Sequence, residues 1–536
     1  MKALKAAAPV EFAFAPTEEQ AAIERLFNRP DHPNVKVVAR AGSGKTGTAR
    51  YLTHSTPRQG IYLAFGKKNA DEARAKFPAH MRVKTTHALA YAAMNVRETW
   101  GHKLKNESNK WPLWRIIQEF GIQKQDGISA EHCAYAAQQG LRNFLYSADS
   151  ALTLSHVHDR SKDEAYFAEQ LFADYQRAHP MATEQARERW AKTALPVRVK
   201  TLVDRYTQKL YEIARALWEA QIDPRHPFPM EHDTYLKLWQ LSQPIIPDID
   251  YLIIDEVQDT NPCVLDIVLR QLCQIVFIGD PAQSIFSFRR AINALDWFDA
   301  ETLYLSLSFR FGQTIADVAN AILRIVYPNL MPIRGNPNVR SQLGVIEEGR
   351  YALVARTNAG LFDEAVDLAR TGQRFHVVGS LKEPIERARS VYHLWAESDS
   401  RWIRHPEIKA YDDWATLKKE AQYDVDLARY VRLIADKGDD VLELCDVLEH
   451  AGEVPAKQAG VILTTCHKSK GLEFPQVRMA EDFSRLKIDE TGSVSGPLEE
   501  FNILYVAATR AQHRLELNAV AQAALNQSLR NTSSNS

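Results

Sequence analysis

Cysteine is scarce in this chain of 536 residues, and this scarcity excludes the common cysteine-based sites. Only five cysteines occur, and none of them forms a Cys-x-x-Cys pair or a Cys/His spacing typical of zinc. A small, odd number of thiols also argues against a disulfide scaffold and favours a reducing compartment. We therefore expect reduced cysteines and a cytoplasmic location.

Long apolar runs are missing as well, and the chain has almost no net charge. No run of 18 apolar residues offers a membrane-spanning helix. Glu11 interrupts the short apolar stretch at the N-terminus, so we expect no signal peptide. The formal net charge is −1, so any surface that binds nucleic acid must be local. The composition is that of an ordinary globular chain, long enough for roughly three or four domains.

Residues 35–46, VKVVARAGSGKT, join an apolar strand to a loop of small residues. In a phosphate-binding loop, glycines let backbone N–H groups surround an anion, the lysine reaches the β- and γ-phosphates, and the threonine holds Mg²⁺. The candidate residues for these roles are Gly42, Ser43, Gly44, Lys45 and Thr46. The strict pattern has a glycine where this chain has Ala39, so this motif alone leaves an ordinary strand-to-helix turn as the alternative.

A second apolar run, residues 251–254, leads directly into Asp255 and Glu256. Such adjacent carboxylates suit two tasks, with Asp255 in the Mg²⁺ shell and Glu256 orienting or deprotonating an attacking water. A solvated acidic turn is the alternative, but α/β sheets place their ligands at this end of a buried strand. Together the two motifs predict an enzyme that binds and hydrolyses a nucleoside triphosphate.

The spacing of the two motifs predicts an inserted domain. Lys45 and Asp255 lie roughly 210 residues apart, too far for two consecutive βαβ units of ~30 residues each. Residues 95–229 fit an insertion, because their apolar residues recur every three to four positions as in helices. Within it, residues 184–209 carry seven Lys or Arg against three Asp or Glu. This surplus is compatible with phosphate contacts or with a solvated helical face.

Two arginines later in the chain suggest a second domain at the nucleotide site. Arg310 follows an alternating, strand-like segment, and Arg510 ends an apolar helical segment. A lone arginine is usually a surface charge. In nucleotide hydrolases, however, arginines from a second domain stabilise the transition state. We therefore expect the ATP site in a cleft between two domains.

The ordered motifs resemble those of the UvrD/Rep-type superfamily 1 DNA helicases. The similar segments are TEEQ (17–20), ARAGSGKT (39–46), YLAFGKKNADEA (62–73), TTHALAY (85–91), IDEVQDTNP (254–262), GDPAQSIFSFRRA (279–291), LSFRFGQTI (307–315), LVARTNAGLF (353–362), TTCHKSKGLEFP (464–475) and EEFNILYVAATRA (499–511). Details such as EEFNILYVAATRA and RFHVVGS (374–380) look closest to the F-box DNA helicases and their bacterial or phage relatives. No F-box-like region precedes the first motif, so we do not expect a ubiquitin-ligase role.

The resemblance implies an α/β fold with two RecA-like cores, each built on a parallel sheet and carrying a mainly helical insertion. It also implies a DNA-dependent ATPase that uses ATP and Mg²⁺ and moves 3′ to 5′ on single-stranded DNA, near the nucleoid. We expect these parts: core 1A at 1–94 and 230–299, insertion 1B at 95–229, core 2A at 300–380 and 459–522, insertion 2B at 381–458, and a disordered polar tail at 523–536.

The resemblance also implies roles around ATP. Gln20 would bind the adenine edge, Phe309 would stack on its face, and Glu473 would hydrogen-bond the ribose. Gln283 is similar to the family's γ-phosphate sensor, and Arg310 and Arg510 look like its arginine fingers. One departure is Gly47, where many relatives have an arginine near the nucleotide, which puts in doubt how tightly the base is held.

A further set of residues matches the positions that line the family's single-strand track. These residues are Phe65, His87, Phe286, Phe288 and Arg289, with His467 joining the track to the ATP cleft. Stacking of bases on aromatic rings is indifferent to sequence, which suits a motor that must grip every nucleotide. Segment 279–290 would thus touch both ATP, through Gln283, and DNA, a few residues later.

Two classes of function remain open from the sequence. The first is a motor that unwinds duplexes or displaces proteins from single strands, in repair, recombination or replication. The second is a DNA-sensing subunit of a repair or defence complex, whose ATPase acts as a switch. Both predict single-stranded DNA and single-strand/duplex junctions as partners, and no membrane.

Overall fold

The computed structural model describes residues 15–106, 109–124, 126–157, 160–287, 290–450 and 454–533. The chain folds into two units. Unit 1 contains Met1–Leu89, Ile245–Ile385 and Leu442–Ser536, and unit 2 contains Ala90–Pro244 and Glu386–Val441. Unit 1 therefore holds most of both expected cores, whereas most of the two expected insertions falls in unit 2, together with residues 90–94 and 230–244 of the expected core 1A.

The first sheet of unit 1 is parallel and has six strands in the order β3-β2-β4-β5-β1-β6. Its strands are β1 (Val35–Ala39), β2 (Gly60–Leu63), β3 (Met81–Lys84), β4 (Tyr251–Asp255), β5 (Gln274–Gly279) and β6 (Glu301–Leu305). The central strands β4 and β5 are short apolar runs, buried along nearly their whole length between two hydrophobic clusters. This sheet and the helices that cover it, α1 (Glu18–Phe27), α2 (Lys45–His54), α3 (Lys67–Arg74) and α13 (Pro262–Leu269), form core one.

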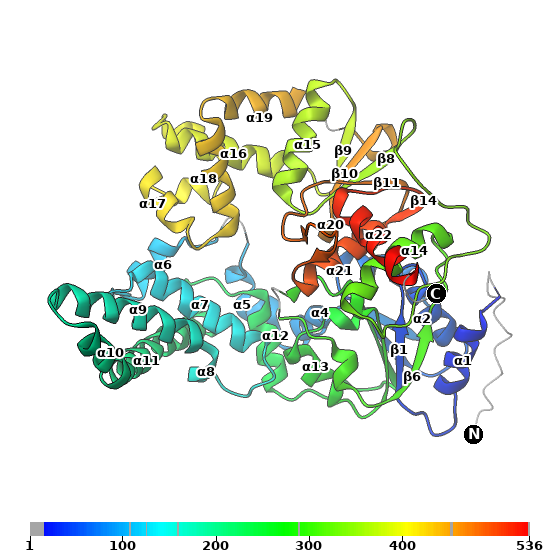
Figure 1. Cartoon of the computed structure of the whole chain (residues 1–536). Coiled ribbons are helices and arrows are strands. Elements are labelled where there is room, and N and C mark those ends of the chain that lie inside the picture. The colour runs from blue at the N-terminus through cyan, green and yellow to red at the C-terminus, as the bar shows by residue number, and fades with distance from the viewer. Residues whose placement is uncertain are drawn as a thin grey trace. The chain divides into compact units, whose positions relative to one another are not determined.

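Strand β6 belongs to core one, so the boundary between the cores lies later in the chain than expected. It pairs with β1 in parallel from Val35↔Glu301 to Ala39↔Leu305, and Figure 1 shows β1 in blue beside β6 in green. The expected boundary at residue 299 was therefore too early, and core one extends through Leu305. Local pattern could not show this, because the partner strand lies far away in the sequence.

The second sheet of unit 1 is also parallel, with the order β7-β14-β11-β8-β10-β9. Its strands are β7 (Gln342–Leu343), β8 (Tyr351–Ala355), β9 (Phe375–Val377), β10 (Val461–Thr465), β11 (Phe474–Met479) and β14 (Ala511–Glu516). Its main helices are α14 (Gln313–Val326), α15 (Asn358–Arg370), α20 (Cys466–Ser469), α21 (Leu498–Ala508) and α22 (Ala519–Ser533), and together they form core two. The expected fold class, two cores on parallel sheets, is confirmed.

Helix α22 corrects the expectation of a disordered tail from residue 523. The helix continues to Ser533. Ala521 and Ala524 are fully buried in the core-two cluster, with Val520 beside them. Small apolar residues at this helical spacing let α22 pack closely on α14. The polar composition of the segment concealed this narrow buried face.

Unit 2 is helical, as expected for the insertions. Its helices include α7 (Ala130–Tyr146), α9 (Arg160–Ala178), α10 (Glu184–Thr193), α11 (Leu195–Ile222), α12 (His232–Leu241), α17 (Trp414–Glu420) and α18 (Val425–Lys437). Helix α11 packs against both α7 and α9 around one hydrophobic cluster. The two chain segments of the unit also bind each other, because the backbone N–H of Leu113 donates to Glu420 at 2.7 Å.

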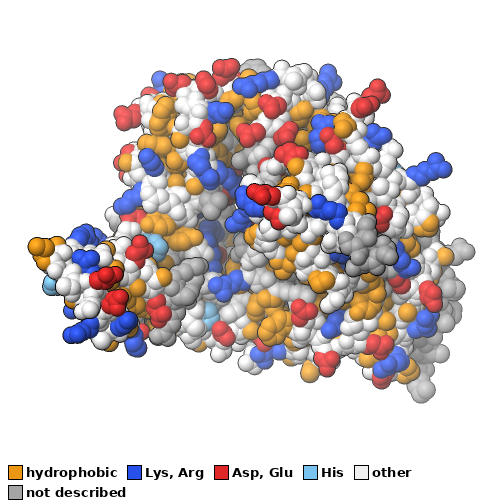
Figure 2. All heavy atoms as spheres, viewed as in Figure 1, with side chains coloured by type: hydrophobic (Ala, Val, Ile, Leu, Met, Phe, Trp, Pro, Cys, Tyr) orange, Lys and Arg blue, Asp and Glu red, His pale blue; other side chains and the backbone are white. Residues whose placement is uncertain are grey.

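Charges are mixed along the surface of the chain. Within the basic stretch of residues 184–209, Lys200 pairs with Asp204 at 2.6 Å and Arg205 with Asp126 at 3.0 Å. Blue and red side chains are likewise interspersed over the face drawn in Figure 2. Among the helices that the structure describes, none is both long and apolar enough to cross a membrane.

Candidate functional site

The loop between β1 and α2 has the backbone of a phosphate-binding loop. Gly42 and Gly44 have φ values of 72° and 80°, in the left-handed region that glycine tolerates best. A Cβ atom at Gly42 would lie only 2.5 Å from the Ser308 Oγ, so the loop also has no room for a side chain there. Helix α2 begins at Lys45 without a capping side chain, and such a helix N-terminus favours an anion.

Side chains from α2, β2 and β4 meet at the carboxyl ends of these strands. Lys45 Nζ lies 3.1 Å from Glu256 Oε1. Thr46 Oγ1 donates to Asp255 Oδ2 at 3.4 Å, and the Tyr62 hydroxyl donates to the same carboxylate. The structure thus brings together the candidates for phosphate binding, metal binding and catalysis.

Burial and neighbouring charges set the protonation of this group. Burial raises the pKa of Asp255, and the adjacent Glu256 carboxylate raises it further. Burial also acts to raise the pKa of Glu256, but Lys45 and Lys470 outweigh it and hold this pKa well below its usual range. Burial acts to lower the pKa of Lys45, whereas Glu256 and other carboxylates raise it above its ordinary value. The site therefore holds an ionised Glu256 beside a charged Lys45.

Thr46 and Asp255 fit a Mg²⁺ ion. A hydroxyl and a carboxylate oxygen lie side by side, and Mg²⁺ prefers oxygen ligands, typically few from the protein and the rest from phosphates and water. No group of three or more His, Cys, Asp or Glu side chains arranged for a metal occurs in the described part of the chain. An ion at Thr46 and Asp255 would consequently depend on phosphate for much of its shell.

Glu256 occupies a strained backbone position. Its φ is 55°, in the left-handed region that is uncommon for residues other than glycine. Its carboxylate also accepts a hydrogen bond from Gln258 Nε2 at 2.6 Å. Strain of this kind costs about 1–3 kcal/mol and clusters at functional sites, where the surrounding structure holds it. Here it turns the side chain at the end of β4 toward Lys45.

The residues expected to bind the base lie beside the loop. A Cβ atom on Gly44 would lie 3.2 Å from the Phe309 ring and 3.7 Å from Gln20 Nε2. Phe309 is 44% exposed, and its backbone N–H donates to the Gly42 carbonyl at 2.8 Å. Gln20 is buried and donates to Thr48 Oγ1 at 3.0 Å. An exposed ring and an amide thus line the same side of the loop.

In the described structure the two expected arginine fingers bind groups of the protein. Arg310 Nε donates to Glu473 Oε2 at 2.9 Å, and its Nη1 donates to the Thr509 carbonyl at 2.7 Å. Arg510 is buried, and its Nε donates to the Val506 carbonyl at 2.9 Å. Burial, followed by the charge of Arg310, lowers the pKa of Arg510 to about 9. Arg310 and Glu473, expected to bind different parts of ATP, are therefore partners of each other here.

Lys470 is a member of the site to which the sequence analysis gave no role. From core two, its Nζ donates to the Asp259 carboxylate and to the Gln283 carbonyl, the latter at 2.8 Å. The same Nζ lies 3.7 Å from Glu256 Oε2. Burial raises the pKa of Asp259 to about 6, although Lys470 acts to lower it. The position of Lys470 in the segment HKSKG was the available signal, but its partners are distant in the sequence.

Part of the expected single-strand track forms an aromatic cluster. The ring centroids of Phe65 and Phe286 are 5.3 Å apart, and those of Phe286 and His467 are 5.8 Å apart. His467 Nε2 is hydrogen-bonded to the Ile285 carbonyl at 3.1 Å. Burial and the charge of Arg356 lower the pKa of His467.

The remaining expected DNA contacts are His87, Phe288 and Arg289. His87 is partly buried in α4 (Thr86–Ala93). Phe288 and Arg289 lie outside the described residues. The nearby Gln283 is buried, and its Nε2 donates to Asp280 at 2.7 Å. Segment 279–287 therefore carries the buried amide of Gln283 and, three residues later, the aromatic ring of Phe286.

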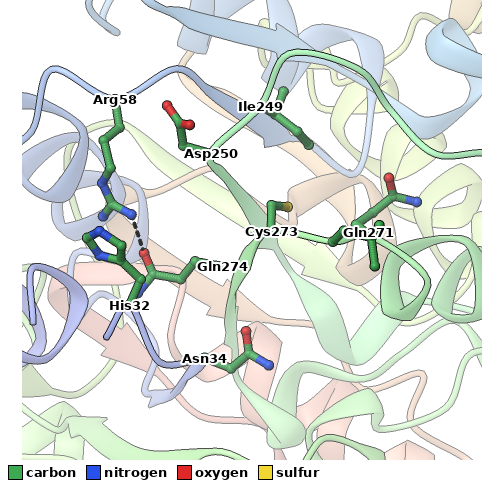
Figure 3. Close-up of a pocket in the computed structure, with 9 residues that line it drawn as sticks. His32, Asn34, Arg58, Ile249, Asp250, Gln271, Cys273 and Gln274 are labelled. Atoms are coloured by element: carbon green, nitrogen blue, oxygen red, sulfur yellow. Dashed lines mark hydrogen bonds between the residues drawn. The ribbon is translucent and has the colours of Figure 1, made fainter. Parts of the chain in front are cut away.

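A hollow elsewhere in core one does not suit a nucleotide. It lies at the amino ends of β1, β2, β4 and β5, opposite the phosphate loop, and its lining includes Arg58, Asp250 and Gln274 (Figure 3). Arg58 Nη1 donates to Gln274 Oε1 at 2.9 Å, so these side chains already bind each other. Ligands of open parallel sheets bind at the carboxyl ends instead.

Comparison with protein families gives two matches that together cover much of the chain. Residues 17–296 match the UvrD/REP helicase N-terminal domain, and residues 416–522 match the UvrD-like helicase C-terminal domain. The first match contains the phosphate loop, the carboxylates of β4 and Gln283. The second contains Lys470, Glu473 and Arg510.

Two curated relatives are similar over most of this chain, and a third is similar over about a third of it. F-box DNA helicase 1 of Gallus gallus is 29% identical over 511 residues, which cover 89% of this chain and 46% of the relative. F-box DNA helicase protein 1 of Schizosaccharomyces pombe is 28% identical over 537 residues, which cover 90% of this chain and 55% of the relative. ATP-dependent DNA helicase PcrA of Staphylococcus aureus is 25% identical over 209 residues, or 36% of this chain and 26% of the relative. The chain thus spans about half the length of the F-box relatives.

Proposed function

Since this chain belongs to the UvrD/REP helicase family, we propose that it is an ATP-dependent DNA helicase and translocase that moves 3′ to 5′ on single-stranded DNA. Duplex unwinding or protein displacement during repair, recombination or replication would be its task. One observation carries the proposal: Lys470 of core two reaches the proposed catalytic carboxylate of core one, at 3.7 Å from Glu256. Both cores thus contribute to one hydrolytic site.

Hydrolysis would use side chains that already lie together. Lys45 binds the β- and γ-phosphates, and Glu256, ionised because Lys45 and Lys470 lower its pKa, orients the attacking water and accepts its proton. Thr46 and Asp255 would hold Mg²⁺, which neutralises phosphate charge when bound.

The base and the ribose would bind between the loop and core two. Phe309 would stack on adenine while Gln20 binds its edge, as their places beside Gly44 support. Arg310 would exchange Glu473 for the γ-phosphate, which frees Glu473 for the ribose. Arg510 is held by backbone carbonyls, so it would act after a change in its own hydrogen bonds.

Single-stranded DNA, including the single strand at a duplex junction, would stack on Phe65 and Phe286. His87, Phe288 and Arg289 would extend this track. The hydrogen bond from His467 to the Ile285 carbonyl would link the aromatic cluster to the segment that carries Gln283. The short segment from Gln283 to Phe286 would therefore couple DNA binding to ATP hydrolysis.

A DNA-sensing subunit with a switch-like ATPase is the second candidate. The intact set of Glu256, Gln283, Arg310 and Arg510 favours the motor, because a switch has no need of rapid hydrolysis. The two candidates differ in whether hydrolysis does work on a duplex.

The decisive experiment measures ATP hydrolysis with and without single-stranded DNA, and then unwinding of duplexes with a 3′ or a 5′ tail. We expect DNA to stimulate hydrolysis and only the 3′-tailed duplex to be unwound. Lys45→Ala should abolish both activities, whereas Lys76→Ala, an exposed lysine of the same core, should leave both unchanged. Hydrolysis that ignores DNA would contradict the motor, and stimulated hydrolysis without unwinding or strand movement would support the switch.

A further inference from the structure

A single buried carboxylate joins the phosphate loop to the proposed γ-phosphate sensor. Asp280 follows β5 and is fully buried. Its Oδ1 accepts from Arg40 Nη1 and from the Ala282 backbone N–H, both at 3.2 Å. Its Oδ2 accepts from Gln283 Nε2 at 2.7 Å and from the Tyr505 hydroxyl at 3.1 Å.

Tyr505 reaches this carboxylate from core two. It lies in α21 and is completely buried. Its hydroxyl donates to Asp280 and also accepts a hydrogen bond from the Ala41 backbone N–H, in the phosphate loop, at 3.1 Å. Burial and the Asp280 carboxylate raise the pKa of Tyr505 well above its ordinary value, so the hydroxyl keeps its proton. One hydroxyl of core two thus binds both the loop and the carboxylate of core one.

Arg40 makes a second connection between the cores. Its guanidinium is buried in the phosphate loop, and its Nε donates to the Met331 carbonyl of core two at 2.7 Å. Arg40 Nη2 is buried and has no hydrogen-bond partner in the described structure. A buried ion pair contributes little net stability, because desolvation offsets the attraction. The Arg40–Asp280 pair therefore suggests a role in orientation rather than in stability.

The carboxylate fixes the direction of the Gln283 amide. An ionised carboxylate only accepts hydrogen bonds, so Nε2 of Gln283, rather than Oε1, must face Asp280. This bond uses one of the two Nε2 hydrogens and leaves the other as a donor. A sensor of the γ-phosphate needs such a donor, since phosphate oxygens are acceptors.

We propose that Tyr505 is a positioning residue for ATP hydrolysis, which holds Asp280 and, through it, the Gln283 amide in the orientation that meets the γ-phosphate. The proposal rests on the proposed function. When core two moves away from core one, the Tyr505 hydroxyl leaves Asp280 and Ala41 together. The sensor is then oriented only while the two cores are in contact. Arg40 supports the same carboxylate from the phosphate loop.

Tyr505→Phe tests this role because it removes only the hydroxyl. A tenfold change in rate corresponds to about 1.4 kcal/mol, which lies within the range that a buried hydrogen bond contributes. We expect kcat for DNA-stimulated hydrolysis to fall about tenfold, with KM for ATP and Kd for single-stranded DNA within about twofold of wild type. A thermal unfolding curve checks that the variant is folded. Tyr206→Phe, which removes a buried hydroxyl in unit 2, is the matched control and should leave kcat unchanged.

A double-mutant cycle separates positioning from a general structural effect. If Tyr505 acts through Gln283, Tyr505→Phe should have almost no further effect on single-turnover hydrolysis in a Gln283→Ala background. Arg40→Lys should behave in the same way, which provides a second route if Tyr505→Phe folds poorly. Additive losses, or a Tyr505→Phe enzyme as fast as wild type, would overturn the proposal. Wild-type protein without DNA-stimulated hydrolysis would instead overturn the proposed function itself.

Discussion

Lys470 of core two binds the Asp259 carboxylate of core one, and its Nζ also lies 3.7 Å from Glu256 Oε2. The charge of Lys470 thus reaches both a structural partner and the proposed catalytic base. Because Lys470 and Asp259 belong to different cores, their ion pair depends on contact between the cores. Protonation of Asp259 should consequently affect hydrolysis.

The Asp259–Lys470 pair predicts loss of activity in acid. Burial raises the pKa of Asp259 to about 6, so the carboxyl is ionised at pH 7.5 and becomes protonated as the pH falls through about 6. Protonation removes the ion pair, and we expect DNA-stimulated hydrolysis to decline between about pH 7 and pH 5. The effect of pH on stability has the opposite direction. Because the pKa of Asp259 is higher in the folded than in the unfolded chain, Asp259 contributes most to the free energy of unfolding at low pH, and this contribution is lost as the pH rises through about 6.

Asp259→Asn isolates this effect, because the amide cannot ionise. We expect slow hydrolysis at pH 7.5 and a flatter pH profile across pH 5–7 than in wild type. Asp266→Asn, which removes a partly exposed carboxylate from α13, is the control and should keep the wild-type profile. An unchanged acid limb in Asp259→Asn would mean that another group controls the decline.

Phe286 should contribute to DNA binding without a direct part in hydrolysis. Phe286→Leu keeps an apolar side chain but removes the ring that faces Phe65 and His467. Stacking of a base on an aromatic ring is worth about 1–3 kcal/mol, so Kd for a single-stranded oligonucleotide should rise about 5- to 150-fold. Hydrolysis without DNA should stay near wild type, measured beside fluorescence anisotropy of a labelled oligonucleotide. Trp297→Ala, an aromatic 70% exposed in core one, is the control, and equal weakening by both variants would contradict a specific site.

The phosphate loop and the carboxylates of β4 could be predicted because their chemistry is contiguous in the sequence. A glycine-rich turn after one apolar strand and an Asp-Glu pair after another are local patterns, and the structure brings both to the same sheet edge. Residues that act through contacts between distant segments were harder to find. Arg40, Asp280 and Tyr505 have no unusual spacing. Arg40 and Asp280 meet because β1 pairs with β5, and Tyr505 joins them only through the packing of α21 against core one.

The fold shows the same limit. The two parallel sheets follow from the apolar runs and the ordered motifs, whereas β6 and α22 were misjudged. β6 joins core one through its pairing with β1 and its packing against α1, and α22 is stabilised by a narrow face of small residues against α14. Neither interaction leaves a strong local pattern in the sequence. The sequence therefore predicted a domain boundary before β6 and, from its polar composition, a disordered tail in place of α22.

Gly44→Ala should impair ATP binding more than its backbone strain explains. The φ of Gly44 is 80°, and the left-handed conformation costs about 1–2 kcal/mol for a residue with a Cβ atom. The new methyl group would also lie 3.2 Å from the Phe309 ring, where we propose that adenine stacks. We expect a lower unfolding temperature and a KM for ATP at least tenfold higher.

Gly121→Ala separates the two effects. Gly121 has a φ of 57° and nothing within 4 Å of an added Cβ atom, so its substitution introduces comparable strain in unit 2 without touching the loop. Both variants should lose similar stability in thermal unfolding, while only Gly44→Ala should raise KM. A rise in KM for both would show that global destabilisation is responsible.

Arg310 and Glu473 predict a substrate-dependent exchange of partners. In the described structure Arg310 Nε donates to Glu473 Oε2 at 2.9 Å, and we propose that ATP separates them, with Arg310 on the γ-phosphate and Glu473 on the ribose. Arg310→Ala should then lower kcat by about 10³–10⁵-fold, as for other arginines that stabilise phosphoryl transfer. Glu473→Gln should have a smaller effect on kcat but should reduce the preference for ATP over 2′-deoxy- or 3′-deoxy-ATP, measured as the ratio of kcat/KM.

Arg334 supplies the control for this exchange, because it also pairs across segments, with Glu19 at 2.8 Å, but its side chain is mostly exposed. Arg334→Ala should change kcat by less than about twofold, since exposed ion pairs contribute only about 0–1 kcal/mol. If Arg310→Ala resembles Arg334→Ala, Arg310 has no part in the transition state. If Glu473→Gln keeps the wild-type discrimination among the ribose analogues, the exchange is wrong for Glu473, and its role is confined to holding Arg310 before ATP binds.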